Sequence, residues 1–415
     1  MSNQCFVCSS DEACLSKLKE HLAEQCYAAR TSEGYLIVSR HFLEFLGKHH
    51  IVVGAATPAH VEQYLKQAQR RYGQCHGHSP DYKGWWSSRT ASIHMLLRLV
   101  QGHWPPAATT AETQHTICEG YTQWMTALRG ITQTTVSARC KEACRFLDWL
   151  GDGPIEVRLA NVAVPDVDTY MKKRTASLRR HSIPTVATNI RSFLRWLHTS
   201  GQTAWDLSPT VIVPTLYACE SIPSALQNQD VKKVLSVAKK DPTPKGIRDY
   251  AILMLLSAYG MRAGEITALC LGDVDWRKEV IRIYHGKTGV TSYLPLLHEV
   301  GEALLAYLQR ARPKTSLREI FLGCRAPYRS FRGGNNLYRL VERRLKAAGV
   351  IAASKRGSHT FRHTRAVSML RAAVPVKEIG DLLGHRTADS TLPYLKLATE
   401  DLRAIALEIP KAVKA

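Results

Sequence analysis

Apolar residues recur three and four positions apart through most of the first half of the chain. Between residues 30 and 205 this spacing predicts amphipathic helices, each with one buried face. The pattern occurs twice, first at 42–47 (FLEFLG), 61–66 (VEQYLK) and 93–99 (IHMLLRL), then at 146–151 (FLDWLG), 167–172 (VDTYMK) and 190–196 (IRSFLRW). We interpret this as one helical module present in two copies, although two unrelated helical hairpins could share the spacing. Gly47 and Gly151 lie where these helices are expected to stop.

Proline-containing stretches separate these patterns. Residues 101–114 contain Pro105 and Pro106, and residues 202–224 contain three further prolines, so both stretches are interpreted as linkers. The expected organisation is an N-terminal segment (1–19), a first helical module (20–104), a second helical module (113–201), a linker (202–224), a C-terminal domain (225–400) and a tail (401–415).

The C-terminal domain has a different pattern. Residues 247–259 are almost continuously apolar, which predicts a buried helix ended by Gly260. Residues 279–284 and 291–296 are rich in β-branched and apolar residues on either side of Gly286–Gly289, which predicts a β-hairpin. The expected fold class is therefore mainly α with a small β-sheet or hairpin: helical N-terminal modules followed by a mixed α/β domain.

The charge balance predicts a polyanionic partner. Lysine and arginine number 56 against 35 acidic residues, a formal net charge of +21. Nucleic acid is the first candidate and an anionic membrane surface the second. The longest apolar stretch, 250–259, is far too short to cross a membrane, and residues 1–30 lack a signal-peptide core. We therefore expect a soluble protein of the bacterial cytoplasm, associated with the nucleoid.

Basic residues are concentrated in the second helical module. A solvated helix face would explain them, but a basic run with no acidic residue between Tyr170 and Ile190 favours contact with DNA phosphates. The residues predicted to bind DNA are Lys172, Lys173, Arg174, Arg179, Arg180, Arg191 and Arg195.

The eleven cysteines are irregularly spaced, which argues for reduced thiols. Cys5 and Cys8, with Cys14 and either His21 or Cys26, could hold zinc, because two thiolates at this spacing fit one edge of a tetrahedron. The other spacings match no common zinc finger, so an N-terminal segment with free thiols is the favoured interpretation.

Six residues in the second half fit a site that cleaves phosphodiesters. They are Arg262 in GMRAGE (260–265), Lys287 in GKTG (286–289), His359 and Arg362 in HTFRHT (359–364), His385 in LLGH (382–385), and Tyr394, nine residues further on. A phosphodiester under attack gains negative charge on its non-bridging oxygens, and the forked guanidinium of arginine binds such oxygens well.

This order of residues within these flanking motifs resembles the tyrosine recombinase (phage integrase) family, over roughly residues 110–400. The resemblance implies that residues 113–201 form a DNA-binding core-binding domain and that the C-terminal domain is catalytic. It implies that Tyr394 attacks the phosphate, that Arg262, Arg362, His359 and His385 surround it, and that Lys287 protonates the departing 5′ oxygen. It also implies that neither metal nor cofactor is needed.

The function expected from this resemblance is site-specific DNA recombination of the integrase or transposase type, through a 3′-phosphotyrosine intermediate. The expected partners are double-stranded DNA and further copies of this chain, with a tetramer in the synapse, together with related recombinases if the first module marks a mobile element. Two alternatives stay open at this point: DNA relaxation like that of a type IB topoisomerase, and a DNA-binding accessory protein without activity.

Overall fold

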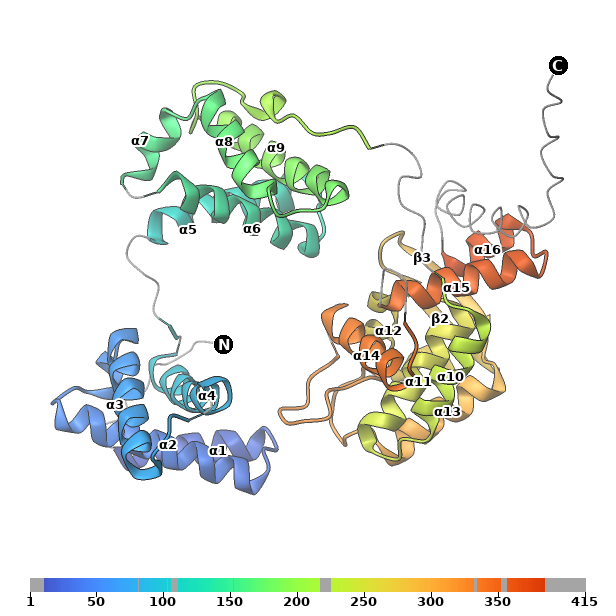
Figure 1. Ribbon diagram of the computed structural model, residues 1–415, viewed down its shortest axis with the longest axis horizontal. Coiled ribbons are helices and arrows are strands. Elements are labelled where there is room, and N and C mark those ends of the chain that lie inside the picture. Colours follow the sequence, from blue (N-terminus) through green and yellow to red (C-terminus); the bar gives the residue numbers. More distant parts are fainter. Residues whose placement is uncertain are drawn as a thin grey trace, which may run out of the picture. The chain divides into compact units, whose positions relative to one another are not determined.

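The computed structural model describes residues 11–80, 82–102, 104–105, 111–151, 153–216, 225–331, 334–351 and 357–384. These residues form helices throughout, with one small sheet in the C-terminal half (Figure 1). Contacts place residues 45–216 in one compact unit, and residues 225–384 together with residues 11–44 in another. The predicted fold class, mainly α with a small β-sheet, is confirmed. The finer domain boundaries stay predictions.

The N-terminal region consists of helices α1 (Asp11–Glu24), α2 (Ala29–Lys48), α3 (Pro58–His76) and α4 (Tyr82–Gln101), with a short 3-10 helix η1 (Val53–Ala55). The apolar positions of the first repeated pattern are buried; Phe45 of α2, for example, packs against the ring of Tyr64 in α3. Two expectations need correction. Helix α1 begins at Asp11, well inside the stretch treated as an N-terminal segment, and Gly47 lies within α2, not after its end.

The second module consists of α5 (Ala111–Arg129), α6 (Gln133–Leu150), α7 (Ile155–Ala160), α8 (Val164–Thr175), η2 (Arg180–Ser182) and α9 (Ile183–Thr199). The apolar faces predicted for it form one core, in which Phe193 lies against the rings of Tyr121 and Trp196. Here Gly151 ends its helix with a positive φ, as predicted.

The beginning of the predicted 202–224 linker belongs to this core. A 3-10 helix, η3 (Ser208–Thr210), follows α9, and Leu207 and Val211 on either side of it are buried in the core of the second module. Over this part the chain therefore lies against the module, with Pro209 inside the 3-10 helix. Likewise, α5 begins at Ala111, inside the first predicted linker.

The C-terminal unit contains seven α-helices and a sheet among its described residues from 225 onward. The helices are α10 (Asn228–Lys239), α11 (Pro244–Tyr259), α12 (Ala263–Ala268), α13 (His298–Arg310), α14 (Gly334–Ala347), α15 (Ser358–Arg371) and α16 (Val376–Leu383), with a 3-10 helix η4 (Leu271–Asp273). Strands β1 (Val274–Asp275), β2 (Val280–His285) and β3 (Val290–Pro295) form an antiparallel sheet in that order. The β2–β3 hairpin is confirmed; β1, two residues long, was not predicted.

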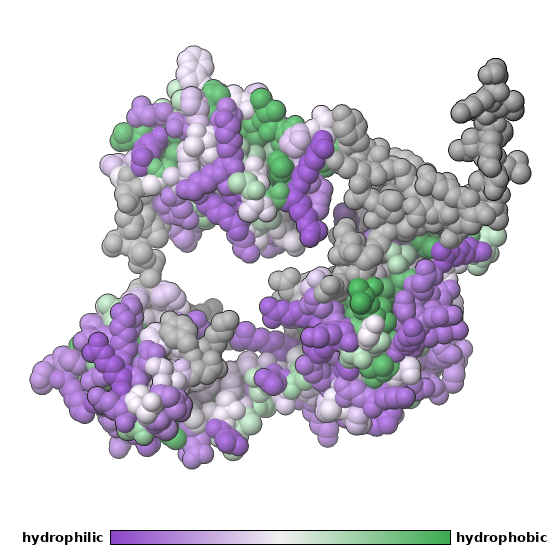
Figure 2. Space-filling view, viewed as in Figure 1, coloured by the Kyte–Doolittle hydropathy of each residue, from purple (hydrophilic) through white to green (hydrophobic). Residues whose placement is uncertain are grey.

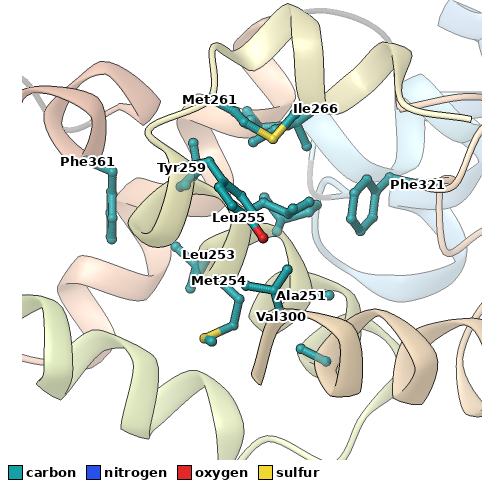
Figure 3. Packing of buried hydrophobic residues seen from close by; sticks show 14 of the residues in the cluster. Ala251, Leu253, Met254, Leu255, Tyr259, Met261, Ile266, Val300, Phe321 and Phe361 are labelled. Atoms are coloured by element: carbon teal, nitrogen blue, oxygen red, sulfur yellow. The ribbon is translucent and has the colours of Figure 1, made fainter. Parts of the chain in front are cut away.

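Helix α11 lies at the centre of this unit. Its side chains are buried almost all round, as its continuous apolar sequence predicts. Figure 3 shows Leu255 and Tyr259 of α11 near Met261 and Ile266, with Phe321 and Phe361 on opposite sides of the view. A helix packed on every side is held rigidly, so the turn that follows it at Gly260 has a fixed position.

The described helices include none that is long and apolar enough to cross a membrane. Hydrophilic residues predominate on the visible face of each part of the chain (Figure 2).

Candidate active site

Two helices that end in glycine meet where the candidate arginines lie. Helix α11 ends at Gly260 and α16 at Gly384, and both glycines have a φ of 62°, in the left-handed region that glycine adopts without strain. The last carbonyls of a helix have no partner within it and carry the negative end of its dipole. The ends of α11 and α16 therefore offer acceptors suited to cations.

Arg262 lies two residues after the first of these glycines and is the N-cap of helix α12. Its Nη1 donates to Oε1 of Glu265 at 2.8 Å, its backbone N–H donates to Oε2 of the same carboxylate at 2.7 Å, and its Nη2 donates to the carbonyl of Gly384 at 3.2 Å. The side chain is 19% exposed. Glu265 thus fixes both the backbone and the guanidinium of Arg262.

Arg362, on α15, approaches the same place from another side. It is only 3% exposed, and its Nη1 donates to the carbonyl of Gly260 at 2.9 Å while its Nη2 donates to the carbonyl of Leu383. The two candidate arginines therefore donate to the adjacent carbonyls of Leu383 and Gly384. The structure brings together two residues that are a hundred positions apart in sequence.

Lys287 lies in the turn of the β2–β3 hairpin and is exposed. The backbone N–H groups of Thr288 and Gly289 both donate to the carbonyl of His285, at 2.9 and 2.8 Å, and Gly289 has a φ of 75°. The GKTG motif therefore forms a compact turn between the two strands, as predicted, and its lysine is exposed to solvent.

His359 is exposed in the first turn of α15, three residues before Arg362, and its ring centroid lies 6.2 Å from that of His363. His385 and Tyr394 lie outside the described residues. The chain leads to them from Gly384, whose carbonyl contacts Arg262. The roles assigned to His385 and Tyr394 thus stay predictions.

His285 and the detailed contacts of Glu265 were not predicted. His285 is 1% exposed; its Nδ1 lies 2.8 Å from Oε1 of Glu265 and its Nε2 lies 3.0 Å from the hydroxyl of Ser292. Burial disfavours the ionised form of Glu265, but hydrogen bonds from His285 and from the backbone and side chain of Arg262 outweigh it and lower its pKa to about 2. The alternation of inward-facing and outward-facing side chains along β2 could have predicted that His285 is buried. It could not have predicted which residues His285 contacts.

The comparisons with known proteins agree with this arrangement. The sequence profile of the Phage integrase family matches residues 224–401. A Sinorhizobium fredii protein named integrase/recombinase y4rA is 36% identical over 302 residues, which cover 72% of each chain. The chain belongs to the phage integrase family. A second protein of that organism, named integrase/recombinase y4gC, is 55% identical over 189 residues, 46% of this integrase and 97% of the relative.

A solved structure shares the fold. The lambda integrase (residues 75–356) dimer bound to a COC′ core site aligns with a TM-score of 0.51 at 17% identity, covering 72% of this integrase and 99% of the solved chain. Membership of the family makes the protein a tyrosine-type site-specific recombinase, so the resemblance drawn from the sequence motifs is confirmed.

The basic residues predicted to bind DNA have varied surroundings in this integrase. Lys172, Lys173 and Arg179 are exposed. Arg174 instead forms an ion pair with the buried Glu142 of α6, with Nε 2.7 Å from Oε1. The absence of acidic residues nearby in sequence did not reveal this partner, because it comes from another helix.

Three further arginines of this set contact the segment after α9. Arg180 donates to the carbonyl of Thr215 at 2.9 Å, Arg191 to that of Val211 at 2.5 Å, and Arg195 to the hydroxyl of Ser208 at 3.5 Å. These contacts hold the chain where it leaves the second module. A role of the seven residues in DNA binding stays a prediction.

The structure describes only some of the cysteines considered as zinc ligands. Cys5 and Cys8 lie outside the described residues, and Cys14 is buried in α1. Within the described part of the chain, no group of three or more His, Cys, Asp or Glu side chains is placed to hold a metal ion.

Replacing Glu265 by glutamine is expected to destabilise the C-terminal unit by on the order of 3 kcal/mol at neutral pH. The pKa of Glu265 is lowered from 4.5 to about 2, so the ionised carboxylate stabilises the fold above about pH 4.5, and this contribution is lost as the pH falls to about 2. The difference between wild type and variant should shrink over that range. Hydrogen exchange of the β2 amides measures this difference, and Glu299→Gln, at an exposed position in the first turn of α13, is the control. A difference that does not depend on pH would contradict this role of Glu265.

Proposed function

We propose that this integrase recombines specific DNA sites by cleaving and rejoining duplex DNA through a 3′-phosphotyrosine intermediate. The observation that carries the proposal is the meeting of Arg262 and Arg362 at the carbonyls of Leu383 and Gly384, directly before His385. Two guanidiniums that approach one point from different helices can each take one non-bridging oxygen of a phosphodiester.

The proposed first step is attack by the phenolate oxygen of Tyr394 on the scissile phosphorus. A phosphotyrosine bond forms, the bond to the 5′ oxygen breaks with its electron pair, and Lys287 protonates that oxygen. The phenol of tyrosine ordinarily ionises near pH 10. Neighbouring cations favour the phenolate. We expect His359 to donate to the phosphate or to relay the phenol proton, and His385 to complete the donors around the phosphate.

The second step reverses the first with a different strand. A 5′ hydroxyl from the partner DNA attacks the phosphotyrosine, and Tyr394 leaves as the phenol. Because the bond energy is kept in the covalent intermediate, rejoining requires no ATP. The arginines neutralise the phosphate charge that a metal ion would otherwise offset, so we expect neither metal nor cofactor to be required.

The proposed partners are double-stranded DNA and further copies of this integrase. Strand exchange between two duplexes involves four strands, so a tetramer in the synapse is the expected assembly. The lambda integrase structure is that of a dimer bound to a core site, which supports DNA binding and assembly here by analogy. The exposed cations of the second module are the proposed phosphate contacts.

The test is strand exchange between two marked DNA fragments that carry the sequences flanking the gene, with supercoiled plasmid in a parallel reaction. Recombination predicts that only fragments with the specific site exchange ends. Relaxation of any supercoiled plasmid without exchange would instead indicate a topoisomerase activity. Binding without any covalent complex would indicate a protein that does not cleave DNA.

Replacing Lys287 by alanine is expected to slow cleavage of ordinary DNA by about a hundredfold or more, because the departing 5′ oxygen loses its proton donor. A substrate with sulfur in place of the bridging 5′ oxygen should restore the rate, since a thiolate leaves without a proton. Cleavage rates on the two substrates measure this. Lys278→Ala, another exposed lysine before β2, is the control, and an equal defect on both substrates would remove Lys287 from this role.

A further inference from the structure

His285 connects three parts of the active site through short contacts. Its side chain reaches Glu265, which holds Arg262, and its backbone carbonyl accepts both amides of the turn that carries Lys287. Its ring also lies directly against Gly384: a Cβ added to that glycine would fall 2.5 Å from the ring of His285. The arginine, the lysine turn and the end of α16 therefore converge on one buried residue.

The chemistry of the contacts fixes the hydrogen on one ring nitrogen. With its pKa lowered to about 2, Glu265 is a carboxylate at neutral pH and can only accept hydrogen bonds. Nδ1 of His285 is therefore a donor to Oε1 of Glu265, the same oxygen that accepts from Nη1 of Arg262. Nε2 faces the hydroxyl of Ser292 on β3, which can donate or accept.

We propose that His285 is a positioning residue that sets the Lys287 turn in register with Arg262. This rests on the proposed function, in which Lys287 protonates the leaving oxygen and Arg262 binds the same phosphate. The side chain of His285 is fixed to the group that holds Arg262, and its carbonyl is fixed to the Lys287 turn. A displacement of the turn is therefore transmitted to Arg262 through His285.

Burial makes this connection stiff. Glu265 and His285 have side chains 4% and 2% exposed, and the two nitrogens of the His285 ring have partners on α12 and on β3. Lys287 at the tip of the hairpin is exposed. The last pair of the hairpin is His285 with Val290, so strand pairing alone leaves Lys287 in an unpaired turn of four residues. Anchoring the base of the turn to Glu265 limits how far the tip can move relative to the arginine.

The experiment that tests this role compares wild type with two variants. His285→Phe keeps a ring against Gly384 but loses both hydrogen bonds, and His285→Asn has an amide that can still donate to Glu265. Cleavage of ordinary DNA and of DNA with sulfur at the bridging 5′ position is measured for each. We expect His285→Phe to lower the rate on ordinary DNA by about ten- to a hundredfold and to regain most of it on the sulfur substrate. His285→Asn should recover a large part of the rate on ordinary DNA.

Ser292→Ala keeps the fold of the hairpin while removing the contact to Nε2, and should show a smaller defect with the same sulfur rescue. Thr291→Ala, exposed on the opposite face of the same strand, is the matched control and should behave as wild type. A defect equal on both substrates, or no defect in any variant, would overturn the positioning role. Failure of the wild-type protein to cleave either substrate would instead contradict the proposed function.

Discussion

Replacing Tyr394 by phenylalanine is expected to abolish covalent attachment to DNA while leaving duplex binding within a few-fold of wild type. The phenol is the only group of the protein that the proposal makes a nucleophile, so its loss removes the first bond-forming step. Binding depends on many phosphate contacts, to which one hydroxyl adds little. Denaturing gels of the protein with labelled DNA measure attachment, and gel shifts under native conditions measure binding.

The matched control is Tyr293→Phe, a change at a tyrosine of β3 that is 69% exposed and pairs with Arg282 across the hairpin. It removes the same hydroxyl from a position without an assigned role and should leave attachment unchanged. A covalent complex that persists in Tyr394→Phe at the wild-type level would show that another residue is the nucleophile.

Replacing Arg262 or Arg362 by lysine is expected to slow cleavage by at least about a hundredfold, the usual cost of losing one donor to a developing oxyanion. Lysine keeps the charge but not the planar fork that can hold a fixed neighbour and a phosphate oxygen together. In Arg262 that fork already spans Glu265 and Gly384, and in Arg362 it spans Gly260 and Leu383. Single-turnover cleavage measures the effect.

In these two variants an effect on the stability of the fold has to be distinguished from an effect on the cleavage rate. Arg362 is 3% exposed, and its hydrogen bonds join the ends of α11 and α16. We expect Arg362→Lys to lower the thermal midpoint as well as the rate, and Arg262→Lys to lower chiefly the rate. Arg277→Lys, at an exposed arginine before β2, controls for charge. Cleavage at the wild-type rate by a folded Arg262→Lys protein would mean that Arg262 does not contact the phosphate.

The sequence was sufficient for features that depend on local pattern. The continuous apolar run predicts helix α11, and the glycine after it predicts the end of that helix, because only the apolar pattern and one left-handed residue are needed. The GKTG turn predicts the hairpin, observed within one residue of the expected ends at both strands. The family motif singled out Arg262 and Arg362, and the structure brings both to the adjacent carbonyls of Leu383 and Gly384; their catalytic roles stay predictions.

Features that depend on contacts between distant segments could not be predicted in this way. The ion pair of Arg174 with Glu142 and the contacts of His285 with Glu265 join residues on different elements. The prolines at 209 and 214 indicated a linker, but Leu207 and Val211 are buried, and no local pattern distinguishes an apolar residue in a loop from one that covers a core. Gly47 continues its helix, because a glycine permits the left-handed conformation without requiring it.

The most direct test of the central claim is to identify the residue that becomes linked to DNA. The protein would be expressed in cells that carry the DNA flanking its gene and lysed in denaturant with excess EDTA. The covalent complexes would be purified, digested with nuclease and protease, and analysed by mass spectrometry. We expect a nucleotide attached through its 3′ phosphate to Tyr394. Attachment at another residue would contradict the proposed mechanism.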